Sequence, residues 1–380
     1  MRNIVLVDPL MFGSRLQISS YITHSLLSNN DSVTIITCLG ADKSDHWKEL
    51  MSDFKPHIKI VAAEIQPRSN YIKLNFKESQ ALAKAILTTS KELESPILIL
   101  AATDDYFLHL PLISFSIKNC GLEAVYFIRY RAEDTIFSTK PSLGFLLRYS
   151  ILKVSQAILN ATLVVFDERL SSRNNTRVIP DPWVISEKDE EHLGDNSNLI
   201  LNGKKIEPGY LLFIGRQDLR KGIAFIINTL KNIKELEQPL VFIGKIEDKY
   251  RADFNQIVKQ HSDKITHINE FVTESEMLKA FKLSCAIAIP YHPSFTSSSG
   301  VLVRAAAMSK PVIATDHGLV GYRVRENKLG ATIKYGDTTS FGFHINNAGQ
   351  LPSFDSKKCE IFKNATNFNT FRKSIIESVK

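Results

Sequence analysis

The stretch LLFIGRQDLRKG, residues 211–222, decides the fold of this chain. Its apolar run ends at Gly215-Arg216, and Lys221-Gly222 begins five residues after Arg216. A short apolar run closed by glycine is typical of a strand buried in a parallel sheet. The apolar positions that follow have helical spacing, so the stretch predicts a strand, a turn and the start of a helix.

The same alternation of strand and helix extends in both directions along the chain. Between the apolar runs, segments such as residues 15–28 and 77–93 have helical spacing of their apolar residues. Repeated strand–helix units predict parallel sheets with helices on both faces. The predicted strands are residues 3–8, 32–37, 57–63, 96–102, 123–129 and 161–167 in the first half and 209–215, 239–244, 265–271, 285–291 and 311–316 in the second.

With 380 residues the chain exceeds one ordinary domain, so we expect two α/β, doubly wound, Rossmann-like domains. Two prolines near residue 181 close the first domain, and the polar, charged stretch after them predicts a linker. The last residues are predicted to be helical, and their return to the first domain stays open. The predicted divisions are 1–183 for the first domain, 184–208 for the linker, 209–350 for the second domain and 351–380 for the helical segment.

Charge and cysteine content narrow the classes of function. The chain has 47 Lys and Arg against 40 Asp and Glu, a net charge of +7 and a pI near 9.0. This excess suits an anionic substrate or an anionic membrane, although many basic proteins have neither partner. No basic run is interleaved with aromatic residues, so we expect no nucleic-acid binding. The four cysteines form no Cys-x-x-Cys pair, which argues against a zinc site and favours reduced, intracellular thiols.

The start of the chain and two missing fingerprints narrow the classes further. The first residues, MRNIVLVDPL, resemble a strand and a turn rather than a signal peptide, so we expect a cytoplasmic protein, with the inner face of the cytoplasmic membrane as an alternative. No Gly-x-Gly-x-x-Gly follows the first strand, which argues against a dinucleotide dehydrogenase. No Gly-x4-Gly-Lys-Ser/Thr is present, which argues against a P-loop nucleoside triphosphatase.

The basic residues of the opening stretch are candidates for binding a diphosphate. Gly215 and Arg216 follow a strand, and Lys221 stands at the start of a helix, where backbone N–H groups lack partners. Two cations and the positive end of a helix dipole together attract phosphate groups. The alternative is that Arg216 and Lys221 are solvated surface cations on an ordinary turn.

A second constellation lies in residues 290–321. A loop of small polar residues leads into an alanine-rich helix, with Ser298 or Ser299 as N-cap and Gly300 allowing close approach of a ligand. Asp316 follows the next strand and is expected at the same edge of the sheet. The alternative is a well-capped helix of the core.

The order of these motifs resembles the donor half of retaining glycosyltransferases of family 4, which have the GT-B fold. The resemblance covers about residues 209–335 well and the first half more loosely. It implies that Arg216 and Lys221 hold the diphosphate of a nucleotide-sugar. It also implies that the peptide around Phe271 and Val272 lies beside the nucleobase. The loop that meets the donor sugar and phosphates would be Thr296, Ser297, Ser298, Ser299, Gly300 and Val301.

The chain departs from the family at its usual Glu-x7-Glu motif. The position of the family's first Glu falls near Thr296 in this chain, and the position of its second Glu is occupied by Arg304. In the family the second Glu binds ribose hydroxyls, whereas a guanidinium cannot accept hydrogen bonds. We expect Arg304 to pair with a phosphate or with Asp316 instead. The departure puts ribose recognition and donor identity in doubt, and loss of catalysis stays an alternative to a divergent branch of the family.

The resemblance places the acceptor on the first domain. Gly13, Ser14 and Arg15 resemble the glycine-rich acceptor loop of such enzymes. Other candidates at strand ends are Asp104, Asp105, Arg129 and Arg131, each of which has a structural cap or a surface ion pair as the alternative. The apolar helix at residues 141–160, which carries Arg148 and Lys153, is interpreted as buried in the first domain; contact with an anionic membrane is the alternative.

The resemblance implies a metal-independent hexosyltransferase. Such an enzyme would move a sugar from a nucleotide-sugar to a glycan or lipid-linked glycan, with retention, in surface polysaccharide synthesis. Arg216 and Lys221 would stabilise the departing diphosphate, which carries the charge that develops in the transition state. No Asp-x-Asp motif lies near these residues, and we expect no metal and no cofactor. The alternatives are a GT-B sugar epimerase or phosphorylase and a catalytically silent protein that binds sugar nucleotides.

Overall fold

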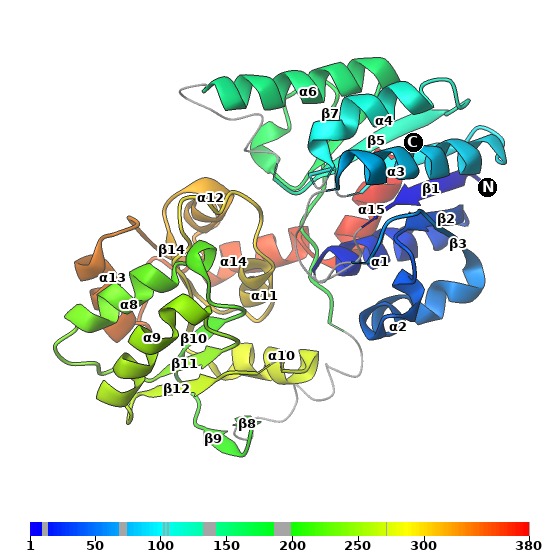
Figure 1. Ribbon diagram of the computed structural model, residues 1–380. Coiled ribbons are helices and arrows are strands. Elements are labelled where there is room, and N and C mark those ends of the chain that lie inside the picture. The colour runs from blue at the N-terminus through cyan, green and yellow to red at the C-terminus, as the bar shows by residue number, and fades with distance from the viewer. Residues whose placement is uncertain are drawn as a thin grey trace. The chain divides into compact units, whose positions relative to one another are not determined.

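The computed structural model describes residues 1–9, 14–67, 74–101, 103–104, 106–131, 142–185, 199–270 and 272–379. The chain divides into two compact units (Figure 1). The first unit comprises Met1–Pro180 together with Phe368–Lys380, and the second comprises Asp181–Asn367. Each unit is built on one parallel sheet with helices on both faces, which is the doubly wound architecture that the sequence predicts.

The first unit has a parallel sheet of seven strands in the order β3-β2-β1-β4-β5-β6-β7. Central strands β1 and β4 are buried along most of their length, because helices cover both faces of the sheet. The strands are β1 (Asn3–Val7), β2 (Ser32–Thr37), β3 (Ile58–Ala62), β4 (Ile97–Leu100), β5 (Ala124–Arg129), β6 (Thr162–Val165) and β7 (Thr176–Val178).

Figure 1 shows α3, α4 and α6 along one face of this sheet and α1, α2 and α15 along the other. Asn75 and Glu78 form a capping box that fixes the start of α3. The helices are α1 (Ser14–Leu27), α2 (Asp45–Met51), α3 (Phe76–Lys91), α4 (Leu110–Ile117), α6 (Leu143–Leu159) and α15 (Phe368–Ser378), with short 3-10 helices η1 (Ala41–Lys43), η2 (Ser52–His57), η3 (Phe107–His109) and η4 (Glu168–Leu170).

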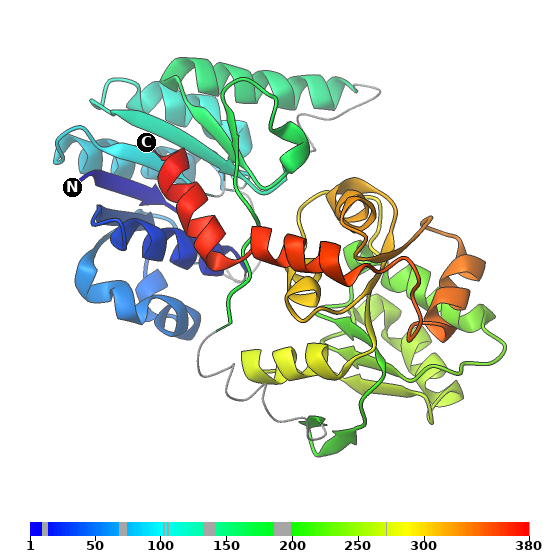
Figure 2. The same cartoon turned by 180° about the vertical axis from the view of Figure 1, so that it is seen from behind.

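The predicted C-terminal helical segment is divided between the two units. Helix α14 (Ser356–Ala365) belongs to the second unit, whereas α15 packs beside α1 in the first (Figure 2). Phe371 and Ile375 are buried in the core of the first unit. Arg2 ties this helix to the sheet, because its guanidinium donates to the Val379 carbonyl and pairs with Asp31 at 2.6 Å.

The second unit has a parallel sheet of six strands in the order β12-β11-β10-β13-β14-β15. Its two faces have separate apolar cores, one under α8, α9 and α13 and the other under α10, α11, α12 and α14. The strands are β10 (Leu211–Ile214), β11 (Leu240–Ile243), β12 (Ile265–Ile268), β13 (Ala286–Ile289), β14 (Val312–Thr315) and β15 (Gly330–Ile333). The helices are η5 (Leu219–Lys221), α8 (Ile223–Asn232), α9 (Asp248–Gln260), α10 (Glu274–Leu283), α11 (Gly300–Ala307), α12 (Gly318–Glu326), α13 (Thr338–Asn346) and α14.

Two predictions about helices and linkers are corrected by the structure. The predicted linker contains a hairpin, β8 (Leu199–Leu201) and β9 (Lys204–Ile206), whose buried leucines belong to the core of the second unit. The helix interpreted as buried, α6, has an outward apolar face, with Leu143 83% and Leu147 58% exposed. Within the described residues no helix combines the length and the apolar character needed to cross a membrane.

Candidate functional site

The carboxyl ends of the strands of the second unit bring most of the predicted donor-site residues to one edge of its sheet. Gly215 directly follows β10 with φ +96°, a conformation that favours glycine. Gly244, which follows β11, lies so close that an added Cβ would be 2.5 Å from the Gly215 carbonyl oxygen. The backbones at the ends of β10 and β11 are therefore in close contact, and the two glycines allow the chain to turn sharply after each strand.

Arg216 is exposed and lines a pocket of about 560 Å³ at the end of β10 and the start of α9. Lys245 and Lys249 line the same pocket, together with Arg251, Glu247 and Asp248. The N-terminal turn of α9 adds the positive end of its helix dipole. Four cations against two carboxylates make this pocket suitable for an anionic ligand.

Lys221 faces a different set of residues. Its Nζ donates a hydrogen bond of 2.7 Å to the Tyr291 hydroxyl and lies 4.2 Å from the centroid of the Tyr291 ring. The same hydroxyl is 2.9 Å from Oγ of Ser299, the buried N-cap residue of α11, whose Oγ accepts from the Leu302 backbone N–H. Tyr291, 3% exposed, therefore joins the ammonium of Lys221 to the N-terminus of a second helix.

The turn between η5 and α8 positions Lys221. Asp218 caps η5 by accepting from the Lys221 backbone N–H at 3.1 Å. Gly222 then adopts φ +80°, and an added Cβ there would lie 2.0 Å from the Pro290 carbonyl oxygen. The backbone of α8 thus approaches the end of β13 more closely than any side chain permits, which brings Lys221 within reach of Tyr291.

We expect Gly222→Ala to lower the free energy of unfolding by about 2–3 kcal/mol, because it adds left-handed strain and a backbone clash. Gly336→Ala is the matched control, since Gly336 has φ +92° with nothing within 4 Å of an added Cβ. Strain alone should cost this control about 1 kcal/mol. Urea unfolding measures both variants. If Gly222→Ala and Gly336→Ala lose the same free energy of unfolding, the close approach of the Gly222 backbone to Pro290 adds no cost and this explanation is wrong.

The serine-rich loop and Arg304 surround the start of α11. Thr296, Ser297, Ser298 and Val301 are half-buried, and Gly300 is exposed at the first position of the helix. Arg304 Nε and Nη2 donate to Oε1 of Glu274 at 3.3 and 3.2 Å. Its Nη1 lies 3.1 Å from where a Gly300 Cβ would stand. The expected pairing of Arg304 with Asp316 is therefore wrong: its carboxylate partner is Glu274, at the start of α10.

Val272 is half-buried and packs against the core of the second unit just before α10. Phe271, Gly13 and Asp105 lie outside the described residues. Ser14 is the first residue of α1, and its side chain lies outside the description as well. Among the described residues no group of three or more His, Cys, Asp or Glu side chains is placed to hold a metal ion.

The acceptor-side candidates of the first unit include a buried ion pair at the ends of β4 and β5. Arg129 Nη2 donates to Asp104 Oδ1 at 2.7 Å, and the two side chains are 3% and 8% exposed. Asp104 Oδ2 also accepts from the Tyr130 backbone N–H at 2.9 Å. Phe107 covers the guanidinium of Arg129 at 4.4 Å. Through these contacts Asp104 and Arg129 hold the turn after β5.

Two further basic candidates lie near this ion pair. Arg15 is buried on α1, with its guanidinium carbon 5.5 Å from the Tyr130 ring centroid, and Arg131 is half-buried. Tyr106 is buried beside them. Burial and the nearby carboxylates of Asp8 and Asp104 hold the pKa of Tyr106 well above its usual value. The Tyr106 phenol is therefore neutral at physiological pH and can donate a hydrogen bond.

Comparisons with known proteins identify the fold. Residues 208–348 match the family model described as glycosyl transferases group 1. A glycosyltransferase from Rickettsia africae aligns with TM-score 0.67 and 14% identity, over 100% of this chain and 98% of that one. The chain has the GT-B fold. No curated protein shows a significant sequence match to it.

Two other solved structures resemble this GT-B chain over their full lengths. Sucrose-phosphate synthase from Thermosynechococcus elongatus aligns with TM-score 0.66 and 15% identity, over 100% of this chain and 98% of that one. The Anabaena protein Alr3699/HepE, solved in complex with UDP, aligns with TM-score 0.66 and 13% identity, over 99% of both chains. At these identities the likeness shows the fold of the GT-B chain and leaves its substrates to be argued from its residues.

Two residues of the GT-B chain were missed by sequence reasoning. Tyr291 was read only as the end of a strand, although it contacts both Lys221 and Ser299. Glu274 was assigned to no site, although it pairs with Arg304. The contact of Tyr291 with Lys221 joins residues 70 positions apart, and that of Glu274 with Arg304 joins residues 30 positions apart, so no local pattern signals these two contacts. The available signal was Arg304 itself: a charged residue on an otherwise apolar helix indicates that a carboxylate partner lies nearby.

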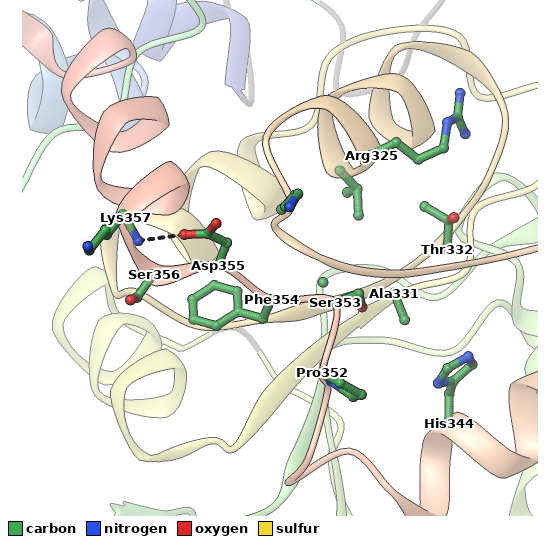
Figure 3. A pocket seen from close by; sticks show the side chains of 13 residues that line it. Arg325, Ala331, Thr332, His344, Pro352, Ser353, Phe354, Asp355, Ser356 and Lys357 are labelled. Atoms are coloured by element: carbon green, nitrogen blue, oxygen red, sulfur yellow. Dashed lines mark hydrogen bonds between the residues drawn. The ribbon is translucent and has the colours of Figure 1, made fainter.

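Figure 3 shows a second pocket of the GT-B chain, of about 790 Å³, which contains none of the predicted site residues. Arg325, Lys328 and Lys357 line it, with the first residues of β15 and His344. Burial lowers the pKa of His344, so this side chain adds no positive charge at neutral pH. This pocket lies at the start of β15, whereas Arg216 and Lys221 follow the carboxyl end of β10. In a parallel sheet these are opposite edges, so the pocket is separate from the predicted donor site.

Proposed function

We propose that the chain is a glycosyltransferase that transfers a sugar from a nucleoside-diphosphate sugar to a glycan or lipid-linked glycan. The observation that carries this proposal is the chain of contacts from Lys221 to the Tyr291 hydroxyl and from that hydroxyl to Ser299, which sets a cation near the N-terminus of α11. Backbone N–H groups and an ammonium at one place suit a diphosphate leaving group. The group 1 domain at residues 208–348 and the UDP complex of Alr3699/HepE support the same donor class.

Glu274 is proposed to bind the ribose of the donor. The family's second Glu is replaced by Arg304 in this chain, and Arg304 holds the carboxylate of Glu274 near the start of α11. Both donors of Arg304 reach Oε1, and the Glu274 side chain is 37% exposed, so Oε2 is accessible to ribose hydroxyls. A carboxylate from α10 thus replaces the one that α11 lacks.

The remaining features of the reaction follow as parts of the same proposal. We infer membership of family 4 and transfer with retention from the order of motifs in residues 209–335. In this proposal Lys221 and Arg216 neutralise the departing diphosphate, so no metal ion is required. Arg15 and Arg131 are proposed to orient the acceptor. A role in surface polysaccharide synthesis at the cytoplasmic face of the membrane agrees with such an acceptor.

Calorimetric titration with UDP, GDP, ADP and their glucose conjugates tests the donor class. We expect at least one nucleoside diphosphate to bind, and Glu274→Gln to weaken that binding about ten- to hundredfold, the scale of a hydrogen bond to a charged group. Glu360→Gln is the control, because Glu360 lies on α14. If none of these nucleotides binds, the proposed donor class is wrong; if Glu274→Gln binds as wild type does, only the ribose assignment is wrong.

Product analysis separates transfer from its rivals. A transferase releases the nucleoside diphosphate in proportion to acceptor glycosylated. A GT-B epimerase would consume nucleotide-sugar rapidly with no acceptor present, and a catalytically silent protein would bind the nucleotide without consuming any sugar donor. Either of the last two results would overturn the transferase proposal while leaving the donor site in place.

A further inference from the structure

The exposed apolar side chains of the described residues concentrate on one layer of the first unit. Helices α3, α4 and α6 pack side by side over one face of its sheet (Figure 1), and we call their outer surface the α3–α4–α6 layer. Of the thirteen large hydrophobic side chains that are exposed among the described residues, seven belong to these helices or to η3 beside them. They are Phe76, Leu108, Phe115, Leu143, Leu146, Leu147 and Val154.

Helix α6 carries an apolar face outward as well as one that packs on the core through Ile151, Leu152 and Leu159. Leu143, Leu146, Leu147 and Val154 follow one another at spacings that place them on one side of a helix, and they are 83%, 49%, 58% and 51% exposed. The buried side contains Leu152 and two polar residues, Ser155 and Gln156. Ser155 Oγ donates to the Ile151 carbonyl, and Gln156 Nε2 donates to the Ala161 carbonyl. A helix that buries polar side chains while exposing leucines is not arranged for water on its outer side.

The charge of the layer is positive. Helices α3, α4 and α6 and their ends contain two acidic residues: Glu78, which is buried in the capping box of α3, and Glu92, the C-cap residue of α3, which pairs with Lys59. Two cations lie beside aromatic rings: Lys118 Nζ is 4.1 Å from the centroid of the exposed Phe115 ring, and Lys153 Nζ is 5.7 Å from the centroid of the half-buried Tyr149 ring. The basic residues of the three helices and their ends are Lys77, Lys84, Lys91, Lys118, Arg148 and Lys153.

We propose that the α3–α4–α6 layer, and above all the exposed stripe of α6, binds the surface of an anionic lipid membrane. Leucines and an exposed phenylalanine would enter the boundary between headgroups and acyl chains, and the lysines beside them would contact lipid phosphates. A second copy of this chain is a poorer occupant, because two identical positive layers repel each other. The proposal stands apart from glycosyl transfer, since it requires no donor site.

Co-sedimentation with vesicles tests the layer in the full chain. We expect binding to vesicles of phosphatidylglycerol and phosphatidylcholine and little binding to phosphatidylcholine alone, with a decrease as salt is raised. Leu146→Ser/Leu147→Ser should weaken binding about tenfold. Lys118→Glu/Lys153→Glu should weaken it at least about fivefold for each cation lost. The matched control is Phe343→Ser/Ile361→Ser, because these side chains are 65% and 67% exposed on the second unit.

Three results would overturn the proposal: equal binding to neutral and anionic vesicles, equal loss in the control and the α6 variants, or a dimer that the α6 substitutions dissociate in sedimentation velocity. Nucleotide titration of every variant keeps the two proposals separate. If the wild-type chain binds a nucleoside diphosphate but does not bind anionic vesicles, the membrane-binding proposal is wrong and the glycosyltransferase proposal is unaffected.

Discussion

Lys221→Ala is expected to lower kcat/KM for sugar transfer by about 10²–10³-fold, the effect of removing one fixed donor from a developing anion. The same variant should weaken nucleoside-diphosphate binding by about 1.5–3 kcal/mol, the scale of a hydrogen bond to a charged group. Tyr291 holds the ammonium, and its hydroxyl in turn contacts Ser299 at the start of α11, so the charge is in place before the donor binds. Steady-state kinetics and calorimetry measure the two effects.

Two further variants separate the charge of Lys221 from its position. Tyr291→Phe keeps the ring under the ammonium and removes the hydroxyl at 2.7 Å, so we expect a smaller loss, about tenfold. Lys357→Ala removes a cation from the second pocket and should leave transfer unchanged. If Lys221→Ala binds nucleoside diphosphates as tightly as wild type, Lys221 is a surface cation with no role in the site. Unchanged thermal unfolding in each variant shows that the fold is intact.

The predicted strands agree closely with the observed ones where they are buried on both faces. The predicted strand at residues 209–215 contains β10 (Leu211–Ile214), and the one at 3–8 contains β1 (Asn3–Val7). Such strands are short apolar runs, which is a local property of the sequence. The structure adds β7 (Thr176–Val178) and β15 (Gly330–Ile333) at sheet edges and the β8–β9 hairpin, because such short strands mix polar or small residues with apolar ones and show no apolar run.

The candidate site was predictable in its residue types and not in its contacts. Gly215 and the N-cap Ser299 lie where local rules for turns and caps put them. The partner of Arg304 was not predictable, because Glu274 comes from another helix and only tertiary packing brings the two together. The exposed stripe of α6 was missed for a related reason. An apolar spacing shows that a helix has one apolar face and does not show which way that face points.

Asp104→Ala is expected to lower the free energy of unfolding of the first unit by about 3–5 kcal/mol. The substitution leaves the guanidinium of Arg129 buried at 3% exposure without its carboxylate. It also removes the acceptor for the backbone N–H of Tyr130. Glu92→Ala is the control, because Glu92 and Lys59 form an ion pair with both side chains more than half exposed. Such a pair contributes about 0–1 kcal/mol. Urea unfolding followed by circular dichroism measures both.

The double variant Asp104→Ala/Arg129→Met decides between a structural and an acceptor role for this pair. Replacing both charges removes the unpaired cation, so we expect it to regain most of the stability lost in Asp104→Ala. If Asp104 and Arg129 only hold the turn after β5, the KM for the acceptor stays unchanged in the double variant, and nucleoside-diphosphate binding by the second unit is unaffected. A raised acceptor KM at restored stability would instead return Arg129 to the acceptor site, because the fold would no longer explain the loss.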